Sequence, residues 1–81
     1  MSDVKTLKIR DEFIKLGQAL KLAGMVDSGI EAKVIIQDGQ VKVDGVIDER
    51  RGRKMYNGMT FEYEGQKVMI SSPFPNPLEE R

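Results

Sequence analysis

Four positive side chains lie close together near the middle of this 81-residue chain, with no acidic residue among them. The cluster consists of Arg50, Arg51, Arg53 and Lys54. Arginine guanidinium groups suit two-point contacts with phosphate and stacking on flat rings, so the cluster is a candidate anion-binding site. A run of charge is also typical of a solvated surface, and Asp48 and Glu49 directly before it offer intramolecular partners. Both interpretations are open at this point.

The residue types that the chain lacks argue against catalysis. It contains no cysteine, which excludes disulfides, thiolate zinc sites and thiol nucleophiles. It contains no histidine, the commonest general base and metal ligand. No glycine-rich phosphate-binding motif is present either. We therefore expect a binding protein and not an enzyme, with no catalytic residue, no metal ligand, no cofactor and no small-molecule substrate.

The composition predicts one small soluble domain. Lys and Arg number 13 and so do Asp and Glu, which leaves a net charge of zero. The hydrophobic fraction of 40% is ordinary for a globular protein. The sequence shows no apolar run long enough for a membrane span and no signal-like start, so we expect no membrane partner. Small secreted domains usually contain disulfides, so a domain of this size without cysteine is expected in the reducing cytoplasm. We also expect a monomer.

Two helices must position the candidate residues. Phe13, Leu16 and Leu20 recur at helical spacing, and Asp11 and Glu12 suit a first helical turn, so we expect a helix of about three turns from Phe13. Its other side would carry Lys15, Gln18 and Lys21. Gly17 inside it either lets a neighbouring helix approach or is a tolerated surface glycine.

The second helix has a clear start and a clear end. Ser28 and Glu31 have the spacing of a capping box, and an apolar run follows them. Gly39 lies where a helix end needs a left-handed residue. For Ser28, capping is the favoured role over ligand contact, although the first turn of this helix offers N–H groups to an anion.

Short alternating segments predict a small antiparallel sheet after the helices. Residues 40–43, 59–63 and 67–70 alternate apolar and polar residues, with turns predicted at Asp44-Gly45, Asn57-Gly58 and Glu64-Gly65. Residues 6–10 predict one more edge strand. Asp44, Asp48 and Glu49 lie on turn signals, where solvated acids are expected. We expect one domain over residues 1–70 and a flexible, proline-containing tail over residues 71–81.

An ordered series of motifs resembles the S4 RNA-binding domain. It runs Ser28, Glu31-Ala32-Lys33, Ile35-Ile36, Asp38-Gly39 and Val41-Lys42-Val43-Asp44-Gly45. The upstream segment Glu12-Phe13-Ile14-Lys15-Leu16-Gly17-Gln18 and the downstream Arg50-Arg51-Gly52-Arg53-Lys54 are similar to those of small stand-alone bacterial S4 proteins of the YaaA/YbcJ type. The resemblance implies an α+β fold in which two packed helices form an L-shaped (αL) motif followed by a small antiparallel sheet.

The resemblance also implies a surface that faces structured RNA, which we expect to be ribosomal RNA during ribosome assembly or maturation. The candidate contacts are Lys15, Lys21, Ser28, Lys33, Lys42, Arg50, Arg51, Arg53 and Lys54. Lys33 is expected to point away from the core, where it either binds phosphate or is only solvated. Tyr56 either stacks on a base or packs at the edge of the core.

Two other functions remain as alternatives. A protein-interaction adaptor would use the sheet edge or the C-terminal tail with Phe74, and it would associate with its partner independently of salt. A small enzyme acting on nucleotides is disfavoured by the missing residue types.

Overall fold

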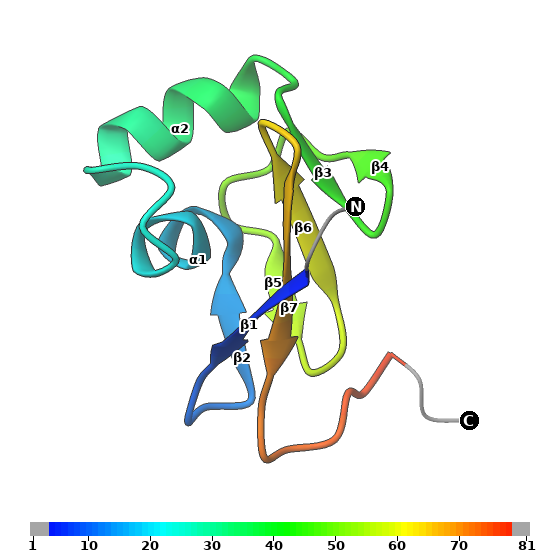
Figure 1. Ribbon diagram of the computed structural model, residues 1–81. Coiled ribbons are helices and arrows are strands. Elements are labelled where there is room, and N and C mark those ends of the chain that lie inside the picture. Colours follow the sequence, from blue (N-terminus) through cyan, green and yellow to red (C-terminus); the bar gives the residue numbers. More distant parts are fainter. Residues whose placement is uncertain (1–3, 79–81) are drawn as a thin grey trace.

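The computed structural model describes residues 4–78 (Figure 1). Two helices and seven strands make up the fold. In chain order they are β1 (Val4–Lys8), β2 (Phe13–Lys15), α1 (Leu16–Leu22), α2 (Gly29–Gln37), β3 (Val41–Val43), β4 (Val46–Ile47), β5 (Lys54–Tyr56), β6 (Thr60–Tyr63) and β7 (Gln66–Ser71). The predicted α+β class, with two helices followed by an antiparallel sheet, is confirmed.

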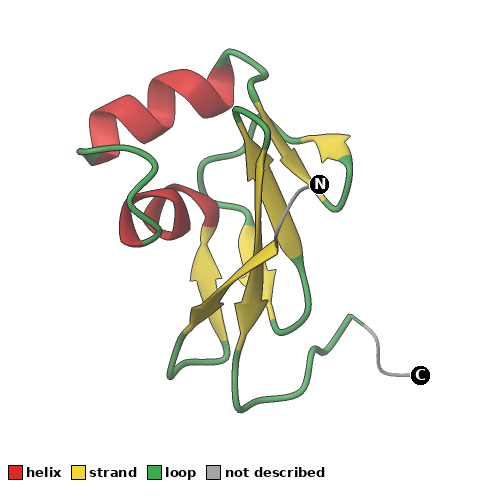
Figure 2. Cartoon of the chain, in the orientation of Figure 1, coloured by secondary structure: helices red, strands yellow, loops and turns green. Residues whose placement is uncertain are grey.

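The strands form two sheets. The larger sheet has the order β1-β7-β6-β3-β4, with antiparallel neighbours except for the parallel pair of β1 and β7. The smaller sheet is a two-stranded antiparallel ribbon of β2 and β5. Both helices lie to one side of the strands, as Figure 2 shows. The predicted strand over residues 6–10 is present two residues earlier, as the edge strand β1.

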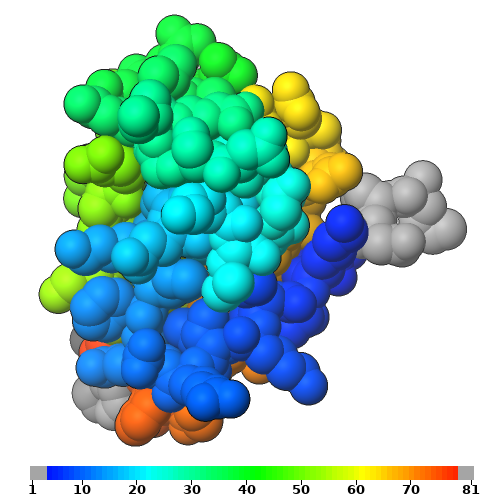
Figure 3. Space-filling view, turned by 90° about the vertical axis from the view of Figure 1, so that its left-hand side faces the viewer, coloured from blue at the N-terminus to red at the C-terminus, as the bar shows by residue number. Residues whose placement is uncertain are grey.

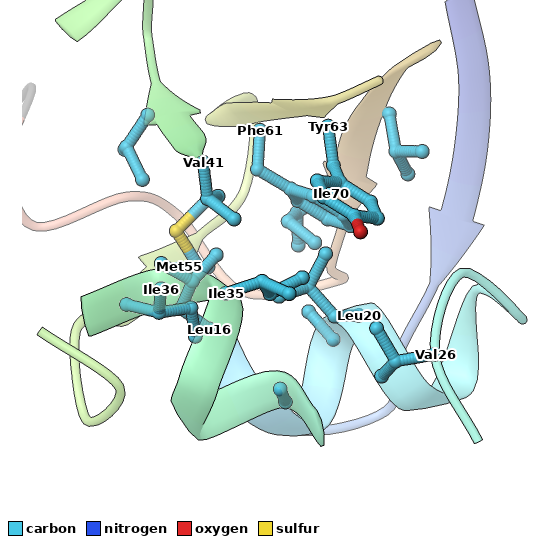
Figure 4. Close-up of a cluster of buried hydrophobic side chains, with 14 of the residues drawn as sticks. Leu16, Leu20, Val26, Ile35, Ile36, Val41, Met55, Phe61, Tyr63 and Ile70 are labelled. Carbon is cyan, nitrogen blue, oxygen red and sulfur yellow. The ribbon is translucent and has the colours of Figure 1, made fainter. Parts of the chain in front are cut away.

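The core fills the space between the helices and one face of the larger sheet. Figure 4 shows sheet side chains such as Phe61 and Ile70 facing Leu16, Leu20 and Ile36 of the helices. All five are completely buried. Alternation along a strand places every second side chain on the other face of the sheet. The helix-free face therefore carries polar side chains such as those of Lys42, Glu62 and Lys67.

Local signals for α2 and for the hairpin after it are confirmed. Gly39, just beyond α2, has a φ of 78°, the left-handed conformation predicted for the helix end. Asp44 and Gly45 have φ values of 50° and 86°, as a type I′ turn between β3 and β4 requires. Asp44 also braces this turn, because its carboxylate accepts a hydrogen bond of 2.9 Å from the backbone N–H of Thr60.

The prediction for the first helix is wrong at its beginning. Residues 13–15 form β2, and α1 begins only at Leu16 and runs for seven residues. The Lys15 backbone is extended, with φ −75° and ψ 146°. Pairing with β5, a partner distant in the sequence, overrides a helical spacing that continues smoothly into Leu16. Asp11 and Glu12 therefore lie in the loop before β2 and not in a first helical turn.

The segment after β7 is attached to the turn between β5 and β6. The side-chain oxygen of Asn57 accepts a hydrogen bond from the Ser72 N–H, at 2.9 Å. The Asn76 amide donates one to the Asn57 carbonyl, at 3.0 Å, and Asn76 is only 6% exposed. The division into a domain over residues 1–70 and a flexible tail over residues 71–81 stays a prediction. The last residues of the tail, 79–81, lie outside the described part of the chain.

Candidate functional site

The arginine-rich loop, residues 48–54, is organised around Asp48. This carboxylate is 7% exposed and accepts bonds from the Arg50 side chain at 3.0 and 2.8 Å and from Arg53 at 2.9 Å. It also accepts the Arg50 backbone N–H at 3.0 Å. Its hydrogen bond from Arg50 lowers the pKa of Asp48 to about 2. The expectation of a solvated acid is therefore wrong for Asp48, because two arginines satisfy it at a buried position.

The same loop lies across the start of α1. The N–H groups of Leu16 and Gly17 donate to the carbonyls of Arg53 and Arg51, at 2.8 and 3.1 Å. A Cβ atom at Gly17 would lie 2.8 Å from the Cγ atom of Arg51. Gly17 thus permits the close approach of another segment, which was one of the two interpretations of this residue. Its neighbour is this loop, however, and not the other helix.

This contact creates a groove of about 440 Å³ between the loop, α1 and the start of α2. Figure 3 shows the green-yellow loop beside the blue α1 and the green α2. The groove is lined by Lys15, Gly17, Gln18, Lys21, Gly29, Arg51 and Gly52. Three of these residues are cations, and within the described chain none of the lining residues is acidic. The groove therefore combines positive charge with small residues that leave room for a ligand backbone.

The β2–β5 ribbon extends this positive surface. Its register places Lys15 opposite Lys54 and Phe13 opposite Tyr56 on one face, while Met55 on the other face is completely buried. The Lys54 ammonium lies 4.8 Å from the Phe13 ring centre. Like charges opposite each other on a ribbon are unfavourable, so Lys15 and Lys54 form a pair that an anion would stabilise.

The other candidate residues lie outside the groove. Ser28 caps α2, because its hydroxyl accepts the Glu31 N–H at 3.1 Å. The Glu31 side chain accepts the N–H of Asp27, and not that of Ser28 as a standard capping box requires. Lys33 is exposed on α2, as expected. Lys42 lies on the helix-free face of the sheet, opposite Ile47 and Glu62, so it cannot share a flat surface with the groove.

The structure thus gathers some of the candidate residues and separates others. Lys15, Lys21 and Arg51 line one groove, and Lys54 adjoins it through Lys15. Arg50 and Arg53 are held by Asp48 on the other side of the loop.

Two functional features were not fully predicted from the sequence. One is the role of Asp48. Its pairing with the basic cluster was one of the open interpretations and is confirmed, but its burial and its bond to the Arg50 N–H were not predicted. The spacing Asp-x-Arg was the signal for that bond, since an aspartate often binds the N–H two residues on. The other is the ribbon face, for which the signal was alternation, as Phe13-x-Lys15 and Lys54-x-Tyr56 each put a ring and a cation on one side of a strand.

The described residues contain neither a metal-ligand cluster nor a membrane-spanning helix. Across residues 4–78, no group of three or more histidine, cysteine or acidic side chains is arranged to hold a metal ion. The two helices of this part of the chain are also too short or too polar to cross a membrane.

Comparison with known proteins agrees with the fold and with the motif series. A family model of the S4 domain matches residues 7–71. The "Putative RNA-binding protein YbcJ" of Escherichia coli is 40% identical over 57 residues, which cover 70% of this chain and 81% of that protein. The "Probable ribosome maturation protein RlbA" of Bacillus subtilis is 46% identical over 59 residues, which cover 73% of this chain and 83% of the relative.

A solved structure extends the agreement to three dimensions. The solution structure of YbcJ from Escherichia coli has a TM-score of 0.66 and 36% sequence identity to this chain. The match covers 88% of this chain and 91% of YbcJ, and that structure is described as revealing an αL motif involved in RNA binding. With a similar fold and a family match over most of its length, this chain belongs to the S4 domain family.

Proposed function

We propose that this protein binds structured RNA without catalysing a reaction, and that its ligand is ribosomal RNA during ribosome assembly or maturation. The names of the two relatives support this, since one is described as an RNA-binding protein and the other as a ribosome maturation protein. The observation that carries the proposal is the groove between the loop, α1 and α2, where Lys15, Lys21 and Arg51 come together.

The distribution of charge supports a polyanionic ligand. The whole chain has a net charge of zero, so the cations of the groove are not a by-product of a basic composition. Lys15 faces Lys54 across the ribbon, and this repulsion is relieved when a phosphate lies between them. Backbone phosphates of an RNA helix supply such anions at regular intervals. The ligand that fits this groove is therefore a phosphate backbone.

A binding role also fits the way in which the acidic residue of the arginine-rich loop, Asp48, is used. Asp48 is committed to Arg50 and Arg53, so it is unsuited to act as a general base. Its function is to hold the loop in the shape that presents Arg51 to the groove. The proposal places the protein in the cytoplasm, as a monomer with RNA as its partner.

The test compares two triple variants that remove the same charge. Lys15, Lys21 and Arg51 are changed to alanine in the first, and Lys8, Lys42 and Lys67, on the helix-free sheet face, in the second. Binding to ribosomal RNA fragments is measured over a range of salt concentrations. The groove variant should bind more weakly, and the slope of log affinity against log salt should fall by about 1 for each phosphate that the variant no longer binds.

The control variant should keep both the affinity and the salt slope of the unmodified protein. Arg50 and Arg53 are left in place in both variants, because removing them would leave the buried Asp48 carboxylate unpaired and confuse folding with binding. Circular dichroism confirms that both variants are folded. Equal RNA affinities of the two variants, or a lower affinity of the control variant, would show that the groove is not part of the RNA interface.

A further inference from the structure

A second hollow lies on the other side of the arginine-rich loop. It measures about 610 Å³, within the range of small-ligand sites. Its lining consists of Arg50, Gly52, Arg53, Lys54, Tyr56 and Leu78. Gly52 lines this hollow and the groove alike, so the loop separates two adjacent depressions. The second hollow differs from the groove in chemistry, because it adds an aromatic ring and an aliphatic side chain to the cations.

The aromatic ring is held in place while remaining accessible. Tyr56 is half-buried, and its ring packs edge-on against Phe13 with centres 5.7 Å apart. Lys54, two residues earlier on β5, lies on the same face of the ribbon. A ring beside a cation is the combination that single-stranded nucleic acids require, since the base stacks on the ring and the phosphate meets the cation.

One cation of this hollow is aligned in advance. Arg50 is 67% exposed, yet its Nε and Nη2 atoms are both bonded to Asp48. These two bonds fix the plane of the guanidinium group and leave Nη1 outside them. A side chain already fixed in one geometry loses less entropy when a ligand binds. Arg50 is therefore preorganised to contact an anion or the flat face of a base.

The aliphatic wall comes from the segment after β7. Asn76 is buried against the Asn57 carbonyl, and its side-chain oxygen accepts the Leu78 N–H at 2.8 Å. These bonds carry Leu78 to the edge of the hollow, where its side chain is 62% exposed. The family model ends at residue 71, so this wall lies beyond the part of the chain that the family match covers.

We propose that this hollow binds an unpaired nucleotide of the RNA, with the base packed on Tyr56 and Leu78 and its phosphate held by Lys54 and the two arginines. The inference rests on the proposed function and names the RNA feature that this side of the loop recognises. An RNA helix lies along the groove, and the strand continues past Lys15 to Lys54, which face each other across the ribbon. This continuity favours RNA over an acidic peptide as the occupant.

The test uses a labelled hairpin RNA with a blunt end and the same hairpin with a single-stranded overhang, compared by fluorescence anisotropy. The unmodified protein should bind the overhang form about tenfold more tightly, the gain expected for one stacked base. Tyr56→Leu and Leu78→Ala should each remove most of this gain. Leu78→Ala, which lies outside the groove and the ribbon, should also leave binding to the blunt hairpin unchanged. Tyr56→Phe should keep the gain, because it keeps the ring.

A control and a set of contrary outcomes complete the experiment. Val46→Ala removes a similarly exposed side chain from β4, outside the hollow, and should change neither affinity. An overhang gain that survives both Tyr56→Leu and Leu78→Ala overturns the proposal, and so does the absence of any gain in the unmodified protein. In either case, salt-dependent binding to the blunt hairpin leaves the proposed function standing.

Two further outcomes separate the remaining possibilities. Failure of the unmodified protein to bind either RNA refutes the proposed function together with this inference. If the Leu78→Ala variant weakens binding of an acidic, phenylalanine-containing peptide while the overhang gain persists, the hollow is a peptide site and the nucleotide proposal is wrong.

Discussion

At the residue scale, the proposed interface depends on an acid and a glycine whose contacts position the arginine-rich loop. Asp48 gathers Arg50 and Arg53, and Gly17 allows the backbone at Arg51 to rest on α1. The sequence allowed Asp48 to pair with the basic cluster, but neither its burial nor the contact at Gly17 follows from the sequence alone. A run of five charges in six residues indicates a solvated surface until the fold buries one of them. Likewise, the identity of the neighbour that Gly17 admits depends on packing between distant segments.

The first prediction concerns Asp48 and acid stability. Its pKa is about 2 in the folded chain, below the value of about 4 for an unfolded aspartate. A lowered pKa stabilises the fold above the unfolded value, and this contribution disappears as the pH falls through about 2. Asp48→Asn should therefore reduce the free energy of unfolding by about 2 kcal/mol at neutral pH.

The difference between Asp48→Asn and the unmodified protein should shrink between about pH 4 and pH 2. Urea unfolding at several pH values measures it. Glu49→Gln removes the same charge from the next position, which is exposed, and should change the stability little. A pH-independent difference, or an equal effect of Glu49→Gln, would contradict the assigned role of Asp48.

The second prediction concerns Gly17. Gly17→Ala should weaken RNA binding severalfold, because the new Cβ meets Arg51 Cγ and displaces the side chain from the groove. Stability should change by less than about 1 kcal/mol, since the better helix propensity of alanine offsets part of the clash.

Gly29→Ala is the matched control for this prediction. Gly29 also lies in a helix and lines the groove, but apart from its chain neighbours and the backbone of its own helix, no described atom lies within 4 Å of a Cβ placed there. Titration of both variants with ribosomal RNA fragments makes the comparison. Equal affinities of the Gly17→Ala and Gly29→Ala proteins would show that the position of Arg51 does not matter.

At the scale of elements, the predicted parts are those with local signals. Ser28 and Gly39 mark the two ends of α2, and Asp44-Gly45 forms the turn between β3 and β4. These features were predictable because capping and left-handed turn geometry depend on neighbouring residues only. The β2–β5 ribbon was not predicted, because it depends on pairing between segments that are far apart in the sequence. Phe13 pairs with Tyr56, far along the chain, and its spacing to Leu16 also satisfies a helix. In so short a segment, pairing with a distant strand outweighs a local helical pattern.

The third prediction exploits the like-charged pair on this ribbon. Lys15→Glu creates an attractive pair with Lys54, so the free protein should gain about 0.5 kcal/mol of stability. The same change puts a negative charge in the groove, and RNA affinity should fall severalfold. Thermal unfolding and RNA titration of the same protein sample measure the two effects.

A neutral variant separates charge from side-chain length in this prediction. Lys15→Gln should give a smaller stability gain and a smaller decrease in affinity than Lys15→Glu. Increased stability with undiminished RNA affinity would place the ribbon outside the interface.

At the scale of the whole molecule, a chain without net charge divides its cations between two faces. The helix side carries the groove and the ribbon face, and the helix-free side carries Lys42 and Lys67 with Glu62 between them in register. The motif series predicted the family and the fold correctly. It could not assign each lysine to a face, because that depends on sheet register, and Lys42 was grouped with residues on the opposite side.

The most direct test of the account is to map RNA binding on the folded protein by nuclear magnetic resonance. Titration of isotope-labelled protein with a ribosomal RNA hairpin should shift the backbone amide signals of Lys15, Gln18, Lys21 and Arg51, which line the groove. Signals of Lys42, Glu62 and Lys67 on the helix-free face should stay in place. Shifts confined to that face, with the groove signals unchanged, would contradict the account.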